Sequence, residues 1–99
     1  MKLFIDTSDN TKTIVGLDKK RLSKPTGPDK SQQVLGLINQ ILKKNKKTLK
    51  DLKEIEVETG PGSFTGLRVG IAVANALGWA LKIPVNGKKV GELVEPKYE

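Results

Sequence analysis

The sequence contains no cysteine and no histidine among its 99 residues. Without cysteine the chain has no disulfide, no thiolate nucleophile and no zinc–sulfur site. Without histidine it lacks the commonest general base and the commonest transition-metal ligand. Aromatic residues make up only 4% of the chain, which argues against a platform on which nucleic-acid bases stack. Many nucleophilic and metal-dependent enzyme classes are therefore excluded before any motif is considered.

Arginine is also scarce, because only Arg21 and Arg68 accompany the lysines. Proteins that read base sequence depend on arginine for bidentate contacts, whereas lysine-rich surfaces suit solubility or diffuse attraction to phosphate. No uncharged apolar run reaches the length of a membrane span, and the start of the chain lacks the apolar stretch of a signal peptide. The composition predicts a cytoplasmic protein with no membrane contact.

What remains is an ordinary globular composition with a strong positive balance. Hydrophobic residues make up 36% and charged residues 29% of the chain, and the net charge is +7. A chain of this length is expected to form one domain with one modest core, and little room is left for a second lobe. We expect the domain to cover residues 1–86 and a loose polar tail to cover residues 87–99.

The order of the sequence patterns predicts a mixed sheet with helices packed on it. Short β-type runs alternate with turn residues, and two longer segments repeat apolar residues at helical spacing. A hairpin followed by crossover helices produces this architecture. The expected strands are 2–6, 12–17, 19–23, 55–59 and 83–85, the expected helices are 29–46 and 67–81, and a capped turn is expected at 48–51.

Asp6, Thr7 and Ser8 follow the first expected strand. A carboxylate and two hydroxyls in such a turn can hold a hydrated Mg²⁺ or phosphate oxygens. The same residues also form turns in which the side chains of Asp6 and Ser8 satisfy backbone amides. Taken alone, this turn favours the structural interpretation.

A glycine-rich loop precedes the second expected helix. Its backbone N–H groups can cradle an anion at the helix start, although the spacing does not match a Walker A loop. The alternative is a sharp strand-to-helix turn in which Ser63 or Thr65 caps the helix, and the residues alone do not separate the two. The candidate residues of this loop are Gly60, Gly62, Ser63, Thr65, Gly66 and Arg68.

Two further patterns concern surfaces. Six lysines lie between positions 43 and 53, where they either form a solvated helix end or contact a phosphate backbone. Small residues recur every fourth position in the second helix and form a ridge that permits close approach of another element. Because this helix is apolar on nearly all sides, we expect the ridge to face a partner rather than the sheet. The expected interface residues are Val34, Ile38, Leu42, Gly66, Gly70, Ala74 and Gly78.

Three stretches resemble the TsaB family, also called YeaZ. They are residues 5–8 (IDTS), residues 48–52 (TLKDL) and, above all, residues 60–70 (GPGSFTGLRVG), and the match runs in order from about residue 2 to residue 85. The resemblance implies an α/β, actin-like (ribonuclease H-like) single lobe, with a mixed five-stranded sheet of order 3-2-1-4-5. Family members usually continue into a second lobe, and many carry a histidine near positions 29–33, where this chain has none.

The resemblance also implies a function. It implies a cytoplasmic accessory subunit with no catalysis, cofactor or metal of its own, which pairs with the catalytic relative TsaD, is joined by the ATPase TsaE, and forms a homodimer when alone. That assembly places threonylcarbamoyl on the adenosine next to the anticodon of tRNAs that read codons beginning with A. The chain would then meet tRNA only indirectly.

Two other functions stay open from the residues. One is a small basic RNA-binding module, whose binding would fall steeply with salt. The other is the remnant of an ASKHA-type phosphotransferase, which shares the aspartate-bearing first turn. Phosphotransfer needs a second lobe that closes over the phosphate and excludes water, so the partner subunit is the favoured hypothesis.

Overall fold

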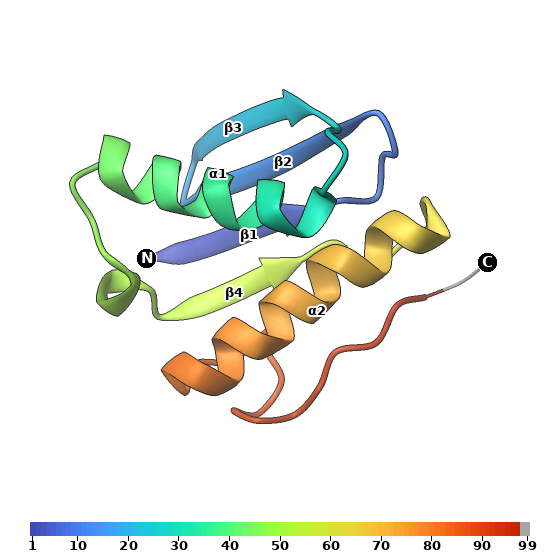
Figure 1. Cartoon of the computed structure of the whole chain (residues 1–99). Helices are drawn as coiled ribbons and strands as arrows, with labels where there is room; N and C mark the ends of the chain where they lie inside the picture. The colour runs from blue at the N-terminus through green and yellow to red at the C-terminus, as the bar shows by residue number, and fades with distance from the viewer. Residues whose placement is uncertain (98–99) are drawn as a thin grey trace.

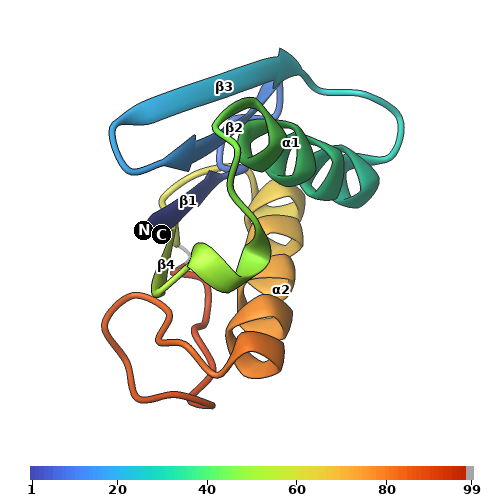
Figure 2. The same ribbon diagram turned by 90° about the vertical axis from the view of Figure 1, so that its left-hand side faces the viewer.

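Two helices cover one face of a four-stranded mixed sheet (Figures 1 and 2). This computed structural model describes residues 1–97. The strand order is β3-β2-β1-β4, with β1 antiparallel to β2 and parallel to β4. The elements are β1 (Lys2–Asp6), β2 (Lys12–Leu17), β3 (Lys20–Pro25), α1 (Lys30–Lys44), the 3-10 helix η1 (Leu49–Asp51), β4 (Glu54–Val57) and α2 (Phe64–Leu81).

Alternation along the strands gives the sheet one buried and one open face. Leu3 of β1 is fully buried on the helix side, whereas Lys2 lies on the opposite side and its ammonium pairs with Glu56 of β4 at 2.8 Å. On that same side the guanidinium carbon of Arg21 lies 4.6 Å from the centre of the Phe4 ring. Within the described residues no helix covers this side, so charged side chains screen it from water.

The expected five-stranded sheet is wrong by one strand. The segment expected to form the fifth strand, 83–85, makes only a single parallel bridge between Ile55 and Val85. Beyond that bridge the side chain of Asn86 binds both backbone groups of Val57, accepting from its N–H at 2.8 Å and donating to its C=O at 3.0 Å. An amide side chain thus replaces the next backbone pair of the ladder, and the strand stops. The bridge still lies beside β4, as the order 3-2-1-4-5 predicts.

Helix α1 forms where the sequence predicts it. Asp29 is the N-cap, and its carboxylate accepts the backbone N–H of Gln32 at 3.1 Å. The helix ends at Lys44, two residues earlier than expected, because Lys46 has a left-handed φ of 56° and the N–H of Lys47 turns back to the C=O of Leu42 at 2.8 Å. The buried face consists of Val34, Leu37, Ile38, Ile41 and Leu42.

Helix α2 begins three residues earlier than predicted. Ser63 is its N-cap, and the hydroxyl accepts the backbone N–H of Gly66 at 3.3 Å. By length and composition α2 is apolar enough to cross a membrane, a property that core helices of soluble proteins share. Here Gly66, Leu67, Gly70, Ile71, Ala74 and Gly78 are buried, so one face of α2 packs in the core.

The C-terminal segment is anchored rather than loose over its described part. Val94 is buried, and its backbone N–H and C=O bind the side-chain amide of Asn75 on α2, at 3.0 and 2.9 Å. The N–H of Lys97 then donates to the C=O of Thr59 at 2.7 Å. The segment therefore runs back beside α2 to the end of β4 (Figure 1). The remainder of the expected tail, 98–99, lies outside the described residues.

Candidate functional site

Two of the three motifs that carry the family resemblance, residues 5–8 and 60–70, meet at the start of α2. The hydroxyl of Thr7, a fully buried residue, donates to the C=O of Gly66 at 2.6 Å and accepts the N–H of Gly70 at 3.1 Å. The N–H of Ser63 donates to the C=O of Ser8 at 2.7 Å. The turn after β1 therefore holds the first turns of α2 by three hydrogen bonds between segments far apart in sequence.

The carboxylate of Asp6 accepts hydrogen bonds within this turn. One carboxylate oxygen accepts both the N–H of Ser8, at 2.9 Å, and its hydroxyl, at 2.6 Å. This is the structural interpretation of the Asp6-Thr7-Ser8 motif. Within residues 1–97 no three carboxylate, histidine or cysteine side chains gather in a way that could hold a metal ion.

The glycine-rich loop is packed onto that turn. A Cβ added at Gly62 would lie 2.6 Å from the Cβ of Ser8, and one added at Gly66 would collide with the carbonyl oxygen of Thr7. Gly60 has a φ of 124°, which side chains rarely adopt. Ser63 caps the helix while Thr65 is exposed, and Arg68 lies outside with its guanidinium carbon 5.5 Å from the Phe64 ring centre. The loop is a strand-to-helix turn in close contact with its neighbour.

The small-residue ridge also packs inward, so the interface predicted from it is wrong in its residues. A Cβ added at Gly70 would collide with the Thr7 hydroxyl, and one added at Gly78 would lie 2.5 Å from a methyl group of Val85. Ala74 is fully buried. Val34, Ile38 and Leu42 of α1 are buried in the same core, with 0%, 3% and 4% of their surface exposed. Spacing shows that these residues share a face, but not which neighbour that face meets.

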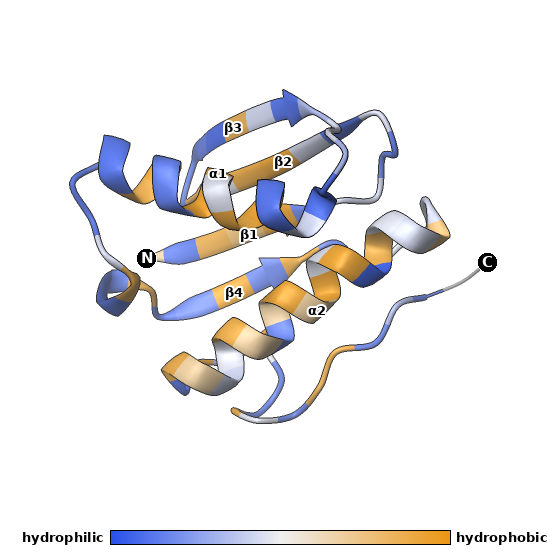
Figure 3. Ribbon diagram, viewed as in Figure 1, coloured by the Kyte–Doolittle hydropathy of each residue, from blue (hydrophilic) through white to orange (hydrophobic). Residues whose placement is uncertain are grey.

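The same two helices instead expose a different apolar surface. Trp79 and Phe64 on α2 are 73% and 54% exposed, and Leu35 on α1 is 51% exposed. A shallow hollow of about 430 Å³ lies over α2 and reaches α1 at Ser31, and Figure 3 shows the apolar character of α2 along its length. We define the outer face as Leu35, Phe64, Ala72, Ala76 and Trp79, all of which are exposed. Sequence reasoning missed these residues, although a helix apolar on nearly all sides was the signal for them.

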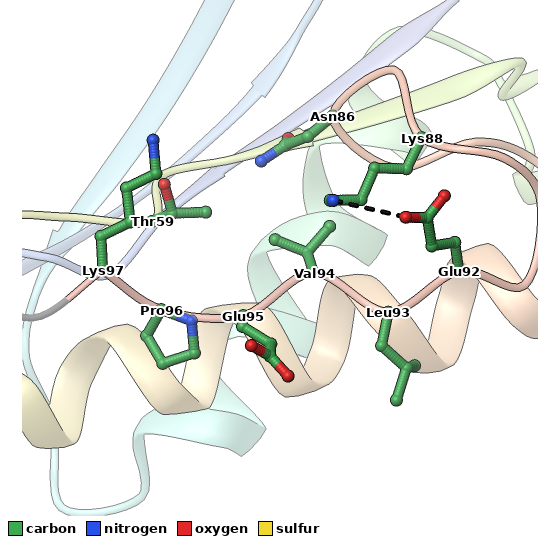
Figure 4. A pocket seen from close by; sticks show the side chains of 9 residues that line it. All are labelled: Thr59, Asn86, Lys88, Glu92, Leu93, Val94, Glu95, Pro96 and Lys97. Carbon is green, nitrogen blue, oxygen red and sulfur yellow. Dashed lines mark ion pairs between the residues drawn. The ribbon is translucent and has the colours of Figure 1, made fainter.

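A second hollow, of about 650 Å³, lies under the C-terminal segment (Figure 4). Three of its polar side chains are already paired, because the ammonium of Lys88 lies 3.5 Å from the Glu92 carboxylate and the Asn86 amide binds the backbone of Val57. We assign this hollow no ligand.

Comparisons with known proteins agree with this geometry. A model of the family described as "TsaD: tRNA N6-adenosine threonylcarbamoyltransferase" matches residues 26–88. The "tRNA threonylcarbamoyladenosine biosynthesis protein TsaB" of Buchnera aphidicola subsp. Schizaphis graminum is 38% identical over 88 residues, which are 86% of this chain and 42% of that protein. The "tRNA N6-adenosine threonylcarbamoyltransferase" of Nitrosospira multiformis is 46% identical over 59 residues, which are 60% of this chain and 17% of that protein.

The structural comparison extends over nearly the whole fold. The solved structure "YeaZ from Pseudomonas aeruginosa" matches with a TM-score of 0.73 and 27% identity, and covers 89% of this chain and 43% of that one. The chain thus spans less than half the length of these relatives. The α/β, actin-like lobe expected from the sequence is confirmed, with four strands in place of five. The chain therefore belongs to the family that the TsaD model describes, and within it to the TsaB (YeaZ) proteins.

Proposed function

We propose that this chain is a non-catalytic, cytoplasmic partner subunit in the biosynthesis of threonylcarbamoyladenosine in tRNA. In this proposal the modification is made next to the anticodon of tRNAs that read codons beginning with A, and a TsaD-like protein performs the transfer. The relatives named TsaB and YeaZ support the pathway. The lack of histidine and cysteine, and the use of Asp6 as a backbone acceptor, support the accessory role.

The observation that carries the partner role is the outer face. An exposed tryptophan and phenylalanine on one helix, with small alanines between them, are unfavourable in water and suit burial against another protein. We propose that a TsaD-like subunit covers this face in the complex, that a TsaE-like ATPase joins the assembly, and that two copies of the chain cover the face for each other when TsaD is absent.

The proposal is tested by co-purification of the tagged chain with the TsaD-type protein of its own organism. Ala72→Glu places a charge in the centre of the outer face, where the alanine is exposed. Ser23→Glu is the matched control, because Ser23 is exposed on β3, an edge strand. We expect Ala72→Glu to fold normally and to weaken the complex by about tenfold or more, since an unpaired charge would be buried at the interface. Equal binding by both variants would contradict the proposed surface.

The second candidate, the remnant of a phosphotransferase, has less support. Its reaction requires a carboxylate and a turn that are open to phosphate, whereas the Asp6 carboxylate accepts two hydrogen bonds from Ser8 and the glycine loop is packed on that turn. Turnover of ATP by the purified chain would restore this candidate.

A further inference from the structure

Eight lysines from three separate segments lie together at one end of the sheet. The strands bring the segments together there, because β2 ends and β3 begins beside the start of β1, where the N–H of Asp18 donates to the C=O of Lys2 at 2.9 Å. The N–H of Lys53 donates to the C=O of Met1 at 2.8 Å, which adds the segment before β4. The end of α1 joins them, and Figure 1 shows these parts gathered around the N-terminus. We define the basic end as Lys19, Lys20, Lys43, Lys44, Lys46, Lys47, Lys50 and Lys53, all exposed.

The contact between the two halves of the basic end is direct. The ammonium of Lys20, at the start of β3, donates to the side-chain carbonyl of Asn45, at the C-cap of α1. A groove of about 510 Å³ lies between β3 and α1 at this point, and Lys20 and Lys44 line it above the apolar side chains of Leu22 and Ile41. Two of the eight lysines, Lys20 and Lys44, therefore line one groove that is built from two different elements.

The positive charge of this end is not neutralised within the chain. The eight lysines are accompanied by three acidic residues, Asp18, Asp51 and Glu54, which leaves five of the net +7 charges here. Asp18 and Asp51 serve as acceptors for backbone N–H groups, those of Lys2 and Thr48. Both ion pairs formed by the described residues, at Lys2 and at Lys88, lie outside the basic end.

Helix capping explains only a part of this cluster. Lys43 and Lys44 lie in the last turn of α1, where they complement the negative end of the helix dipole. The β2–β3 turn and the segment of residues 46–53 contribute the other lysines, and the dipole acts only within the last turn of a helix. The helix dipole therefore does not account for the other six lysines of the basic end.

We propose that the basic end binds the phosphate backbone of RNA. Clustered, exposed lysines attract a polyanion without reading its bases, and no aromatic residue is part of this cluster. Membrane binding is less well supported, because an interfacial surface inserts several apolar side chains; at this end the exposed apolar side chain is Leu49, at 41%, whereas the exposed tryptophan and phenylalanine lie on α2. The general binding of RNA stands independently of the proposed function. The choice of tRNA as the natural RNA rests on that function, and a direct contact with tRNA would replace the indirect one that the family resemblance implies.

The test measures binding of the full chain to unmodified tRNA, and to an RNA hairpin of unrelated sequence, by fluorescence anisotropy between 50 and 200 mM KCl. The basic-end variant is Lys44→Gln/Lys47→Gln/Lys50→Gln. The matched control is Lys12→Gln/Lys89→Gln/Lys97→Gln, which removes the same charge from exposed lysines elsewhere. Thermal melting verifies that both variants are folded.

We expect the unmodified chain to bind both RNAs, and each phosphate contact to add about −0.9 to the slope of log K against log [salt]. The basic-end variant should lose about tenfold or more in affinity at 50 mM salt and reduce that slope by roughly 2 to 3, because three contacts are removed. The control should lose less than about threefold.

Three results would overturn the proposal: no RNA binding at 50 mM salt, equal losses in the two variants, or binding to phosphatidylglycerol vesicles or to an acidic polypeptide alone. Co-purification with the TsaD-type protein separates this inference from the proposed function. If the chain binds RNA through the basic end but never binds that protein, the proposed function is refuted and the RNA-binding proposal stands. If the chain binds that protein but not RNA, only the RNA-binding proposal is refuted.

Discussion

Two glycines in different helices should respond in opposite ways to the same substitution. Gly70 on α2 is buried, and a new Cβ would collide with the hydroxyl of Thr7 and lie 3.3 Å from a methyl group of Ile5. Gly36 on α1 is exposed, and a new Cβ would meet nothing within 4 Å. Alanine gains about 0.8–1 kcal/mol of helix propensity over glycine at either position. Only the surroundings of the methyl group therefore separate the two variants.

The magnitudes follow from these contacts. Gly36→Ala should raise the free energy of unfolding by about 0.5–1 kcal/mol. Gly70→Ala should lower the free energy of unfolding by roughly 1–3 kcal/mol through overpacking and by about 1 kcal/mol through the disturbed hydrogen bond between the Gly70 N–H and Thr7. The same gain in helix propensity offsets a part of this loss. The net expectation is a loss of about 1–3 kcal/mol, which in a domain of this size lowers Tm by roughly 4–8 °C for each kcal/mol.

Urea unfolding followed by circular dichroism measures both changes. The double variant Thr7→Ala/Gly70→Ala removes the hydroxyl that the methyl group meets, so its loss should be smaller than the sum of the two single losses by about 1 kcal/mol. If Gly70→Ala is as stable as the unmodified chain, or if the double variant is strictly additive, then α2 does not approach β1 as closely as the structure has it.

Three further predictions use other parts of the molecule. Ala74→Leu should destabilise the fold by about 1–3 kcal/mol through overpacking and leave the oligomeric state unchanged. Thermal melting and light scattering measure the two effects, and a stable but monomeric variant would show that the small-residue ridge of α2 faces a partner. The chain alone, given tRNA, ATP, threonine and bicarbonate, should form no modified nucleoside, and product detected by mass spectrometry would refute the accessory role. The backbone N–H of Thr48 lowers the pKa of Asp51, so Asp51 contributes stability above about pH 4 that disappears as the pH falls through the lowered pKa. The Tm difference between Asp51→Asn and the unmodified chain should therefore shrink in acid, and a difference constant with pH would contradict it.

The secondary structure was largely predictable because its causes are local. Asp29 accepts an N–H three residues away, and Ser63 does the same at the start of α2, as capping residues do. Short β-type runs bounded by turn residues placed β1 and β2 at the bounds that the structure has. The predicted capping box was also correct, since the carboxylate of Asp51 accepts the N–H of Thr48 at 2.8 Å.

The candidate site was less predictable because its alternatives differ only in long-range contacts. The Asp6-Thr7-Ser8 turn and the glycine loop each allowed a ligand-binding and a structural interpretation. What separates them is the pairing of Thr7 with Gly66 and Gly70, across 59 and 63 residues of sequence. No local pattern contains that information, since a glycine that contacts a backbone and one that contacts a phosphate have the same spacing.

By itself the sequence determined both helices and four of the five expected strands, the absence of histidine and cysteine chemistry, the positive charge and the family motifs, because each of these depends on residue type and short-range spacing. Only the tertiary structure decided which face of α2 meets the sheet, where Asn86 ends the fifth strand, and that lysines from the β2–β3 turn join those after α1. Periodicity defines a face of a helix relative to its own axis. The direction in which that face points is set by packing against elements elsewhere in the chain.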